Sequence, residues 1–326
     1  MIARHRRRLT AALVVVTVAV SALLLPGAPK SGAEVPPPVV VAVGDIACKA
    51  QAERDQGAIC RSDLVAGLAT EIAPDRFLPL GDIQYEKGSL ADFLRVYDAQ
   101  FGHLKAITSP APGNHEYGTP DAQGYFDYFG TAAAPPHGYY SFDLGGWHLV
   151  SLNSEICGSD PGCGPGTPQY EWLGDDLATS NADCTLAYWH HPRYDWRPWQ
   201  KFVTDDDPNP NGGTEVTPFI PLWELLYSDG ADVVLNGHNH VYHRWLPQDA
   251  HGNAVDDGVV QFTVGTGGRL LYSQGRPPRP ENLTGFQNHD FGVLKLTLQP
   301  GSYDFEWVSV KDEPAFSDAG EDVPCS

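Results

Sequence analysis

The chain has 326 residues, with 41 acidic against 21 basic side chains and a net charge of −20 at neutral pH. So negative a surface repels nucleic acid backbones and anionic lipid, which argues against duplex nucleic acid or a stable membrane partner. Any anionic small molecule that binds must therefore be attracted by bound cations.

The first residues predict an export signal over residues 1–33. Four arginines within the first eight residues precede an apolar run from Leu9 to Leu25 and a small-residue stretch ending near Ala33. A retained membrane anchor is the alternative, because the run is marginal for the roughly 20 apolar residues that span a bilayer. The pair Arg6-Arg7 leaves general secretion and twin-arginine export both open. The segment holds five of the basic and none of the acidic residues, so the rest carries 16 basic against 41 acidic ones, a net charge of −25.

The first half of the remaining chain alternates strands and helices. After a Pro-rich linker over residues 34–38, the apolar run 39–43 predicts a buried strand that ends just before Asp45. We expect a helix from Ser62 as its cap, a strand over residues 77–80 before Asp82, and a second helix from Ser89. Their predicted inward faces are Leu64, Val65, Leu68, Ala69 and Ile72 in the first helix, and Leu90, Phe93, Leu94, Tyr97 and Phe101 in the second.

The same alternation continues to the end of the chain. The pattern predicts strands over residues 147–152, 185–189, 232–235 and 261–264, helices over 168–179 and 218–227, and a hairpin of 292–298 with 303–308 turned at Pro300-Gly301. These elements indicate one α/β domain over residues 39–310, with a C-terminal tail over 311–326. In α/β sheets, ligands gather beyond the carboxyl ends of the strands, so loops far apart in sequence can share one pocket.

Six cysteines in an exported chain predict three disulfides, although 15 pairings exist. The pairing we favour joins Cys48 to Cys60 and Cys157 to Cys163 as short loops. Cys184 would then hold Cys325 and tether the C-terminal tail. The alternative for Cys48 is a thiolate metal ligand near Asp45.

Five short blocks along the chain carry oxygen or nitrogen ligands at the ends of predicted strands. They are Val43-Gly44-Asp45, Gly81-Asp82-Ile83-Gln84-Tyr85, Gly113-Asn114-His115-Glu116, Tyr188-Trp189-His190-His191 and Gly237-His238-Asn239-His240. Mixed carboxylate, amide, phenol and imidazole groups favour a pair of transition metals over calcium. Two ions about 3.5 to 4 Å apart can share one carboxylate, for which Asp82 is placed, and clamp both oxygens of a phosphoryl transfer. The blocks therefore predict a two-metal phosphoesterase site, with these ligands: Asp45, Asp82, Tyr85, Asn114, His190, His238 and His240.

At these blocks the chain resembles the purple acid phosphatase branch of the calcineurin-like metallophosphoesterases, whose pattern is D-x-G, G-D-x-x-Y, G-N-H-[DE], V-x-x-H and G-H-x-H. The resemblance implies an α/β fold with a central β-sandwich flanked by helices in four αββα layers. It implies Fe(III) at one position and divalent iron, zinc or manganese at the other, with Asp82 shared. By resemblance, Asp45, Tyr85 and His240 complete the first position, and Asn114, His190 and His238 complete the second.

Departures from the family pattern concern mostly the surroundings of the ligands. Ala47 stands where the wider superfamily has a histidine ligand, and Tyr85 would fill that vacancy. Tyr85 could instead be an aromatic packing residue. Ala187 replaces the valine of the fourth motif, and His243 occupies a place often held by glutamate. After His190 the sequence also has no distal histidine pair of the kind found in the larger plant-type enzymes. The resemblance therefore defines the substrate contacts less well than the metal contacts.

The resemblance implies an exported phosphatase that hydrolyses small-molecule phosphate monoesters by in-line attack of a metal-bound hydroxide. We expect His115 to orient the phosphoryl oxygens or protonate the leaving group, because an imidazole near neutrality can do either. His191 is the candidate for substrate contact. Arg244 is more simply a structural ion-pair partner. The alternatives are a phosphodiesterase or nucleotidase on the same ligands, or a module that binds metal or phosphate without turnover. The oligomeric state cannot be predicted from these patterns.

Overall fold

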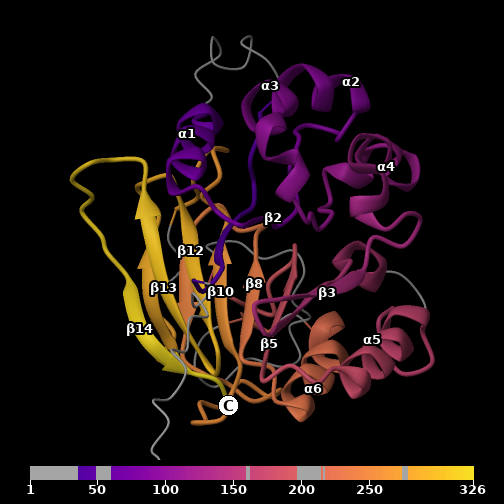
Figure 1. Cartoon of the computed structure of the whole chain (residues 1–326), viewed down its shortest axis with the longest axis vertical. Helices are drawn as coiled ribbons and strands as arrows, with labels where there is room; N and C mark the ends of the chain where they lie inside the picture. Colours follow the sequence, from indigo (N-terminus) through magenta and orange to yellow (C-terminus); the bar gives the residue numbers. More distant parts are fainter. Residues whose placement is uncertain (1–35, 49–59, 159–161, 197–213, 216, 274–277) are drawn as a thin grey trace, which may run out of the picture. The chain divides into compact units, whose positions relative to one another are not determined.

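The computed structural model describes residues 36–48, 60–158, 162–196, 214–215, 217–273 and 278–326 (Figure 1). The predicted export signal and the start of the predicted linker lie outside these residues. The chain divides into two compact units, Met1–Pro36 and Pro37–Ser326, and every helix and strand below belongs to the second.

The first sheet has five strands and mixes parallel and antiparallel pairs. In spatial order they are β14 (Ala319–Pro324), β13 (Ser302–Ser309), β12 (Gly292–Gln299), β1 (Val39–Val43) and β2 (Arg76–Pro79). Strands β1 and β2 are parallel, and β12 and β13 form the predicted hairpin, which turns at Gly301 with a φ of 76°. Glycine adopts this left-handed conformation without the penalty that a Cβ would bring.

The second sheet has seven strands, and four of them are mutually parallel. In spatial order they are β11 (Leu283–Gln287), β9 (Tyr242–Trp245), β10 (Val260–Val264), β8 (Val233–Asn236), β5 (Cys184–Trp189), β4 (Trp147–Ser151) and β3 (Tyr140–Leu144). Strands β10, β8, β5 and β4 are the parallel ones, so the loops after them open at the same edge. A short separate ladder joins β6 (Tyr194–Asp195) to β7 (Thr214–Glu215).

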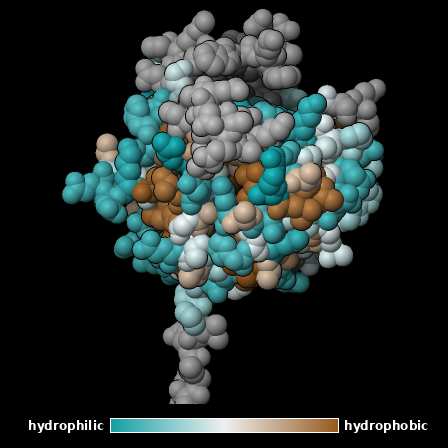
Figure 2. Space-filling view, turned by 90° about the horizontal axis from the view of Figure 1, so that it is seen from above, coloured by the Kyte–Doolittle hydropathy of each residue, from teal (hydrophilic) through white to brown (hydrophobic). Residues whose placement is uncertain are grey.

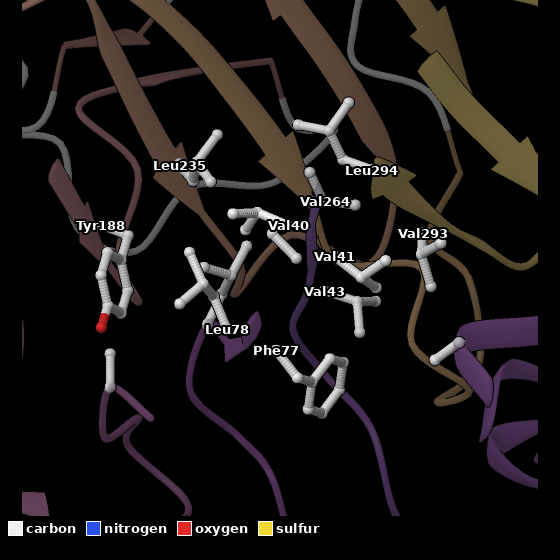
Figure 3. Packing of buried hydrophobic residues seen from close by; sticks show 14 of the residues in the cluster. Val40, Val41, Val43, Phe77, Leu78, Tyr188, Leu235, Val264, Val293 and Leu294 are labelled. Carbon is white, nitrogen blue, oxygen red and sulfur yellow. The ribbon is translucent and has the colours of Figure 1, made fainter. Parts of the chain in front are cut away.

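The main core lies between the two sheets. On β5, Leu186 and Tyr188 belong to this core, whereas Ala187 and Trp189 belong to a second core on the other face of the sheet. Figure 3 shows Tyr188 in the same cluster as Val40 of β1. Because both faces of the central strands are buried, their sequences read as continuous apolar runs. The predicted α/β fold with a central β-sandwich is confirmed.

The helices pack on the outer faces of the sandwich. They are α1 (Ser62–Ile72), α2 (Leu90–Asp92), a π-helical turn (Phe93–Tyr97), α3 (Asp98–Phe101), α4 (Gln123–Phe129), α5 (Pro168–Thr179) and α6 (Ile220–Asp229). Short 3₁₀ segments are Gly102–Ile107, Glu116–Gly118, Pro120–Ala122, Gly130–Ala133, Ser154–Gly158 and Thr217–Phe219. Helices α1 to α4 gather at the top of Figure 1, and α5 and α6 lie together below, where they complete the second core.

Several details of the predicted helices were wrong. Ser62 is the first residue of α1 and not its cap, which is Arg61 and makes no side-chain cap hydrogen bond. Leu64 and Leu94 were predicted to point inward, but they are 48% and 58% exposed. In this second helical region three other predicted inward residues, Phe93, Tyr97 and Phe101, are buried, and a π-helical turn spans Phe93–Tyr97.

The predicted C-terminal tail is partly ordered as a strand. Residues 319–324 form β14 and pair with β13 at the edge of the first sheet. Strands β3, β9 and β11 were also not predicted. Strand β3 pairs antiparallel with β4, and β9 pairs antiparallel with both β10 and β11.

The three disulfides have the predicted pairing, Cys48 with Cys60, Cys157 with Cys163 and Cys184 with Cys325. Cys48 is therefore not a thiolate metal ligand in this structure. The third bridge closes a sequence separation of 141 residues and connects the C-terminus to β5, which ends at the motif containing His190.

The described surface shows no large apolar face in the view of Figure 2, where hydrophobic residues form separate patches among hydrophilic ones. In the part of the chain that the structure describes, no helix is long and apolar enough to cross a bilayer.

Candidate metal centre

Five loops bring the seven predicted ligands to one place, where the edges of the two sheets meet. Backbone hydrogen bonds join the loops directly: Gly44 N donates to Val264 O (2.9 Å), and Gly237 N donates to His190 O (3.0 Å). Asp45, Asp82 and His238 have positive φ angles of 61°, 47° and 68°. Such a conformation costs a non-glycine residue about 1 to 3 kcal/mol and persists only where the surrounding contacts enforce it. The fold therefore holds three predicted ligands in strained loops.

Tyr85 joins the four residues predicted for the first metal position. Tyr85 Oη lies 3.0 Å from Asp45 Oδ1, 3.0 Å from His240 Nε2 and 3.2 Å from Asp82 Oδ2. His240 Nε2 is also 3.2 Å from Asp45 Oδ1. Tyr85 is buried and points at the other predicted ligands, so its phenol oxygen belongs to the centre rather than to the aromatic core.

The residues predicted for the second position form an adjoining group. Asn114 Oδ1 lies 3.2 Å from His190 Nε2 and 3.1 Å from His238 Nδ1, and these two nitrogens are 3.3 Å apart. His190 Nε2 lies 3.3 Å from Asp82 Oδ2. Asp82 is thus the residue common to both groups, as expected for a shared carboxylate.

Main-chain carbonyls select the inward-facing nitrogens of two histidines. His190 Nδ1 is 2.8 Å from Leu80 O, and His240 Nδ1 is 2.7 Å from Leu270 O. A carbonyl only accepts hydrogen bonds, so Nδ1 carries the proton in each ring and Nε2 is left as the ligand nitrogen. This is the usual support for a metal-bound imidazole.

The donor set fits a pair of cations. Asp45 Oδ2 is buried and has no hydrogen-bond partner among the described residues. An unsatisfied buried carboxylate oxygen is costly unless a cation neutralises it. Burial, followed by the charges of Asp45 and Asp82, raises the pKa of Tyr85 well above its usual range, and a bound cation would act in the opposite direction.

Charges within the centre are strongly coupled. Burial raises the pKa of Asp82, but the charge and hydrogen bond of His190 and the contacts of His115 outweigh it, so that pKa lies well below its usual range. Burial lowers the pKa of His190, while Asp82 and Asp45 raise it to about 10. Without cations, a protonated histidine supplies the positive charge that these carboxylates require.

Two glycines leave room around Asp45. A Cβ at Gly237 would lie 2.7 Å from Leu80 O and 2.9 Å from Asp45 Oδ2, and a Cβ at Gly265 would lie 1.9 Å from Asn239 O. Real Cβ atoms do not approach so closely, so any larger residue would displace a loop that carries ligands.

Glu116 is a supporting residue to which the sequence interpretation assigned no role. Its Oε1 accepts hydrogen bonds from Ile83 N (2.9 Å) and Gln84 N (3.1 Å), and its Oε2 accepts one from Gly113 N (2.8 Å). The carboxyl group thus ties the loop of Asp82 and Tyr85 to the loop of Asn114. Burial, followed by the charge of Asp82, raises its pKa to about 8. The sequence feature that could have indicated this role is the position of Glu116 at the end of the Gly113–Glu116 motif.

The segment after β10 forms another wall that was not predicted. Arg269 N donates to Asp45 O (3.1 Å), and its guanidinium lies 4.8 Å from the centroid of the Tyr85 ring and 2.7 Å from Glu86 Oε1. The ring of Tyr272 stacks on His240 at 4.1 Å. The sequence pattern predicted the strand before this segment, over residues 261–264, and no role for the segment itself.

His115 lies at the centre, half-buried. Its backbone N donates to Asp82 Oδ1 (2.8 Å), its Nδ1 is 2.6 Å from Glu86 O, and its Nε2 is 3.7 Å from Asp82 Oδ2. The Tyr85 ring lies 4.2 Å away between centroids. The imidazole is therefore beside the shared carboxylate, and its predicted role stays a prediction.

His191 lies on the side of the second group. Its ring centroid is 4.2 Å from that of His238. Its Nδ1 lies 3.0 Å from Ser154 Oγ and 3.2 Å from Glu155 Oε1. Burial raises the pKa of Glu155 to about 7, although the charge of His190 opposes the shift. Glu155 was not predicted, yet it follows a predicted strand as the other site residues do.

Arg244 does not join the centre. Its Nε and Nη2 each donate a hydrogen bond of 2.8 Å to the carboxylate of Asp318, and Tyr242 Oη donates to the same carboxylate at 2.9 Å. The interpretation of Arg244 as a structural ion-pair partner is confirmed.

Comparisons with known proteins agree with this geometry. Residues 38–242, more than half of the chain, match the family described as calcineurin-like phosphoesterase. The chain is 28% identical over 232 residues to Purple acid phosphatase 15 of Arabidopsis thaliana, covering 60% of this chain and 40% of that protein. It is 27% identical over 255 residues to Acid phosphatase type 7 of Danio rerio, covering 69% and 56%. The chain thus spans about half the length of these curated relatives.

Solved structures share the fold. The purple acid phosphatase PPD1 from yellow lupin seeds superposes with a TM-score of 0.70 at 20% identity, covering 86% of this chain and 53% of that one. GAP50, the anchor in the inner membrane complex of Plasmodium, superposes with a TM-score of 0.59 at 11% identity, covering 89% and 90%. The chain therefore belongs to the calcineurin-like phosphoesterase family, and its predicted resemblance to the purple acid phosphatases is confirmed.

Proposed function

We propose that this protein is a metal-dependent phosphoric ester hydrolase that releases phosphate from small-molecule phosphate monoesters. The observation that carries the proposal is the convergence of seven ligand-type side chains from five loops, joined through Tyr85, Asp82 and Asn114. One of these ligands, Asp45, has a buried Oδ2 with no hydrogen-bond partner among the described residues. The relatives named as acid phosphatases support the monoester assignment.

Two cations would be held in adjoining positions that share Asp82. Asp45, Tyr85 and His240 complete the first position, and Asn114, His190 and His238 complete the second. When bound, such a pair supplies positive charge that acidifies water and neutralises the phosphoryl group during transfer. We propose Fe(III) at the first position, where a phenol oxygen stands in place of a histidine, and divalent iron, zinc or manganese at the second.

The protein's own groups orient and select the substrate. Leu80 O and Leu270 O hold the imidazoles of His190 and His240 with Nε2 facing inward. His115 has its Nδ1 held by Glu86 O and its Nε2 near the shared carboxylate, so it can orient the phosphoryl oxygens or donate a proton to the leaving oxygen. His191 is proposed as a substrate contact from the side of the second group.

We also propose that the protein is exported. Three disulfides support this location, because such bonds persist in oxidising compartments and are rare in reducing ones. Residues 1–33 have the pattern of an export signal. Sequencing the amino terminus of the protein recovered from culture medium would test both points.

The deciding experiment compares hydrolysis of 4-nitrophenyl phosphate with that of bis(4-nitrophenyl) phosphate, alongside metal analysis of the same preparation. Monoester preference with two metals per chain is expected. Diester preference would move the assignment to a phosphodiesterase on the same ligands. Full metal occupancy without turnover of either ester would favour a binding module.

A matched pair of histidine substitutions links turnover to the centre. His238→Ala should lose activity together with metal. His251→Ala replaces an exposed histidine outside the centre and should keep both. Activity that survives His238→Ala with unchanged metal content would contradict the assignment. A preparation containing only zinc or manganese, with no visible tyrosinate absorption, would overturn Fe(III) and leave the hydrolase proposal standing.

A further inference from the structure

We infer that Asn239 is a positioning residue of the metal centre, which fixes the directions of His238 and His240 through its hydrogen bond to Asp195. The inference rests on the proposed function, since it takes these two histidines to be metal ligands. The juxtaposition that carries it is a buried amide between two ligand residues, bonded to a buried carboxyl group from another segment.

The two histidines lie at the centres of consecutive three-residue turns. Asn239 N donates to Gly237 O at 2.8 Å, across His238. Val241 N donates to Asn239 O at 2.6 Å, across His240. Hydrogen bonds between residues i and i+2 define γ-turns, and the turn with a positive central φ, here 68° at His238, is the rare and strained form. Asn239 is common to both turns, so its position sets the direction in which each imidazole leaves the main chain.

The two histidines serve different metal positions. His238 belongs to the second position, where its Nδ1 lies 3.1 Å from Asn114 Oδ1. His240 belongs to the first position, where its Nε2 lies 3.0 Å from Tyr85 Oη. A shift of Asn239 therefore moves one ligand of each position. Because metal–ligand distances are held to within about 0.2 Å, such a shift weakens both positions together.

The side chain of Asn239 is tied to the segment that follows the fourth ligand block. Its Nδ2 donates to Asp195 Oδ1, and both residues are fully buried. An ionised carboxylate only accepts hydrogen bonds, so the amide nitrogen must face Asp195. Asn239 Oδ1 has no hydrogen-bond partner among the described residues. In that part of the chain, the side chain is therefore held by one identifiable hydrogen bond.

The segment that carries Asp195 is itself fixed to the second sheet. Gln261 of β10 accepts hydrogen bonds at its Oε1 from Arg193 N (3.1 Å) and Tyr194 N (2.9 Å). Its Nε2 donates to Tyr194 O at 2.7 Å, and the whole side chain is buried. The backbone just before Asp195 cannot shift without breaking these bonds, so its carboxyl group is a fixed support for the amide of Asn239.

The backbone of Asn239 packs against the glycine loop after β10. A Cβ at Gly265 would lie 1.9 Å from Asn239 O and 2.6 Å from its carbonyl carbon. Gly265 N also donates to Val241 O at 3.0 Å. The glycine loop therefore locates the carbonyl group of Asn239, while Asp195 locates its amide side chain.

The test measures the zinc affinity of the full-length protein, stripped of metal and titrated in competition with a chromogenic chelator that resolves two equivalents per chain. The variants are Asn239→Ala, Asn239→Asp and the exchange of Asn239→Asp with Asp195→Asn, and the melting temperature of each metal-free protein is recorded. Asn282→Ala is the matched control. Asn282 is also buried, and its amide donates to Gln248 Oε1 (3.0 Å) and Gly252 O (2.9 Å), beyond the other end of β9.

We expect Asn239→Ala to weaken both zinc equivalents about 10- to 100-fold, the range for residues that support metal ligands. Asn239→Asp keeps the size of the side chain but sets a carboxylate against Asp195, so its loss should be at least as large. The exchange variant restores one amide–carboxylate pair and should bind zinc within about tenfold of the wild type. Asn282→Ala should lower the melting temperature of the metal-free protein and leave zinc affinity unchanged, which separates positioning from a general loss of stability.

Three results would overturn the inference. They are wild-type zinc affinity in Asn239→Ala, a loss confined to one equivalent, and an exchange variant as weak as Asn239→Asp alone. If Asn239→Ala does not fold, the isosteric Asn239→Asp and the exchange variant provide the same comparison. A wild type that binds two zinc ions with this dependence on Asn239 but hydrolyses no ester would refute the proposed function alone. A wild type that binds no zinc would overturn both.

Discussion

Two histidine–carboxylate clusters in this protein have the same chemical groups in different surroundings. In the metal centre, His190 and His240 face Asp82 and Asp45 at 3.3 and 3.2 Å. In a second cluster, which we call the outer cluster, His148 lies between Asp143 and Asp176 at 2.9 Å from each. Residue types alone do not distinguish the two clusters, since both combine histidine with aspartate.

The two clusters differ in whether their polar atoms have hydrogen-bond partners within the protein. Both ring nitrogens of His148 already have carboxylate partners, and the Asp143 side chain is 77% exposed. In the metal centre, Nδ1 of His190 and of His240 is bound to a carbonyl and Nε2 of each faces the other ligands, while Asp45 Oδ2 has no partner among the described residues. The outer cluster is satisfied as it stands, whereas the metal centre requires cations. Unsatisfied inward atoms on strained loops, rather than the residue types, mark the site.

Removal of metal should have the largest effect that distinguishes the metal centre from the outer cluster. Treatment with a chelator should lower the melting temperature of the wild type, because ligand present at 1,000 times its Kd stabilises the native state by about 4 kcal/mol. Differential scanning calorimetry before and after chelation measures the shift. If the melting temperature is unchanged although metal has been lost, then cations do not stabilise this centre and the interpretation is wrong.

Paired Asp→Asn substitutions should show the next largest effect. Asp82→Asn weakens the carboxylate shared by both positions and should lower kcat/KM more than about hundredfold, since even residues that only support ligands account for about 10- to 100-fold. Asp176→Asn in the outer cluster should leave kcat/KM unchanged. Steady-state hydrolysis of 4-nitrophenyl phosphate measures kcat/KM for both variants. Equal losses of kcat/KM would show that the two clusters do not differ in function.

Glu116 provides a smaller effect within the metal centre. Glu116→Ala leaves three backbone N–H groups without their acceptor and loosens two ligand loops. Metal affinity should fall about 10- to 100-fold, as measured by competition with a chromogenic chelator. Glu116→Gln retains acceptor capacity and should lie between alanine and the wild type. An alanine variant with wild-type metal affinity would show that the loops are held without Glu116.

The outer cluster should reveal itself in the pH dependence of stability. The hydrogen bond that His148 donates to Asp176 raises the pKa of His148 above its ordinary value, although burial opposes the shift. The protonated histidine therefore contributes stability below the unfolded-state pKa of about 6.5, and this contribution disappears as the pH rises through the raised folded-state pKa. We expect a contribution below about 1 kcal/mol, which Asp176→Asn should reduce at pH 5.5 but not at pH 9. Urea unfolding at the two pH values measures it, and an equal loss at both would exclude the linkage.

The sequence alone determined most of the local elements and the candidate metal ligands. Pro168 at the start of α5, the apolar run of β1 and the turn at Gly301 act over a few residues, and the structure agrees with these predictions. The metal-ligand candidates were identified in the same way, because each follows a strand and occupies a short motif of defined residue types. Even the disulfide pairing could be predicted, since two of the bridges close short loops.

Only the tertiary structure decided which distant groups support those ligands. Leu270 O against His240, Glu155 against His191 and the pairing of β14 with β13 depend on contacts between segments far apart in the chain. The exposed positions of Leu64 and Leu94 likewise follow from how each helix sits on its neighbours rather than from apolar spacing. Local patterns report the periodicity and turn chemistry of nearby residues. A carbonyl or carboxylate brought in by another loop leaves no such pattern, because its effect comes from position in space.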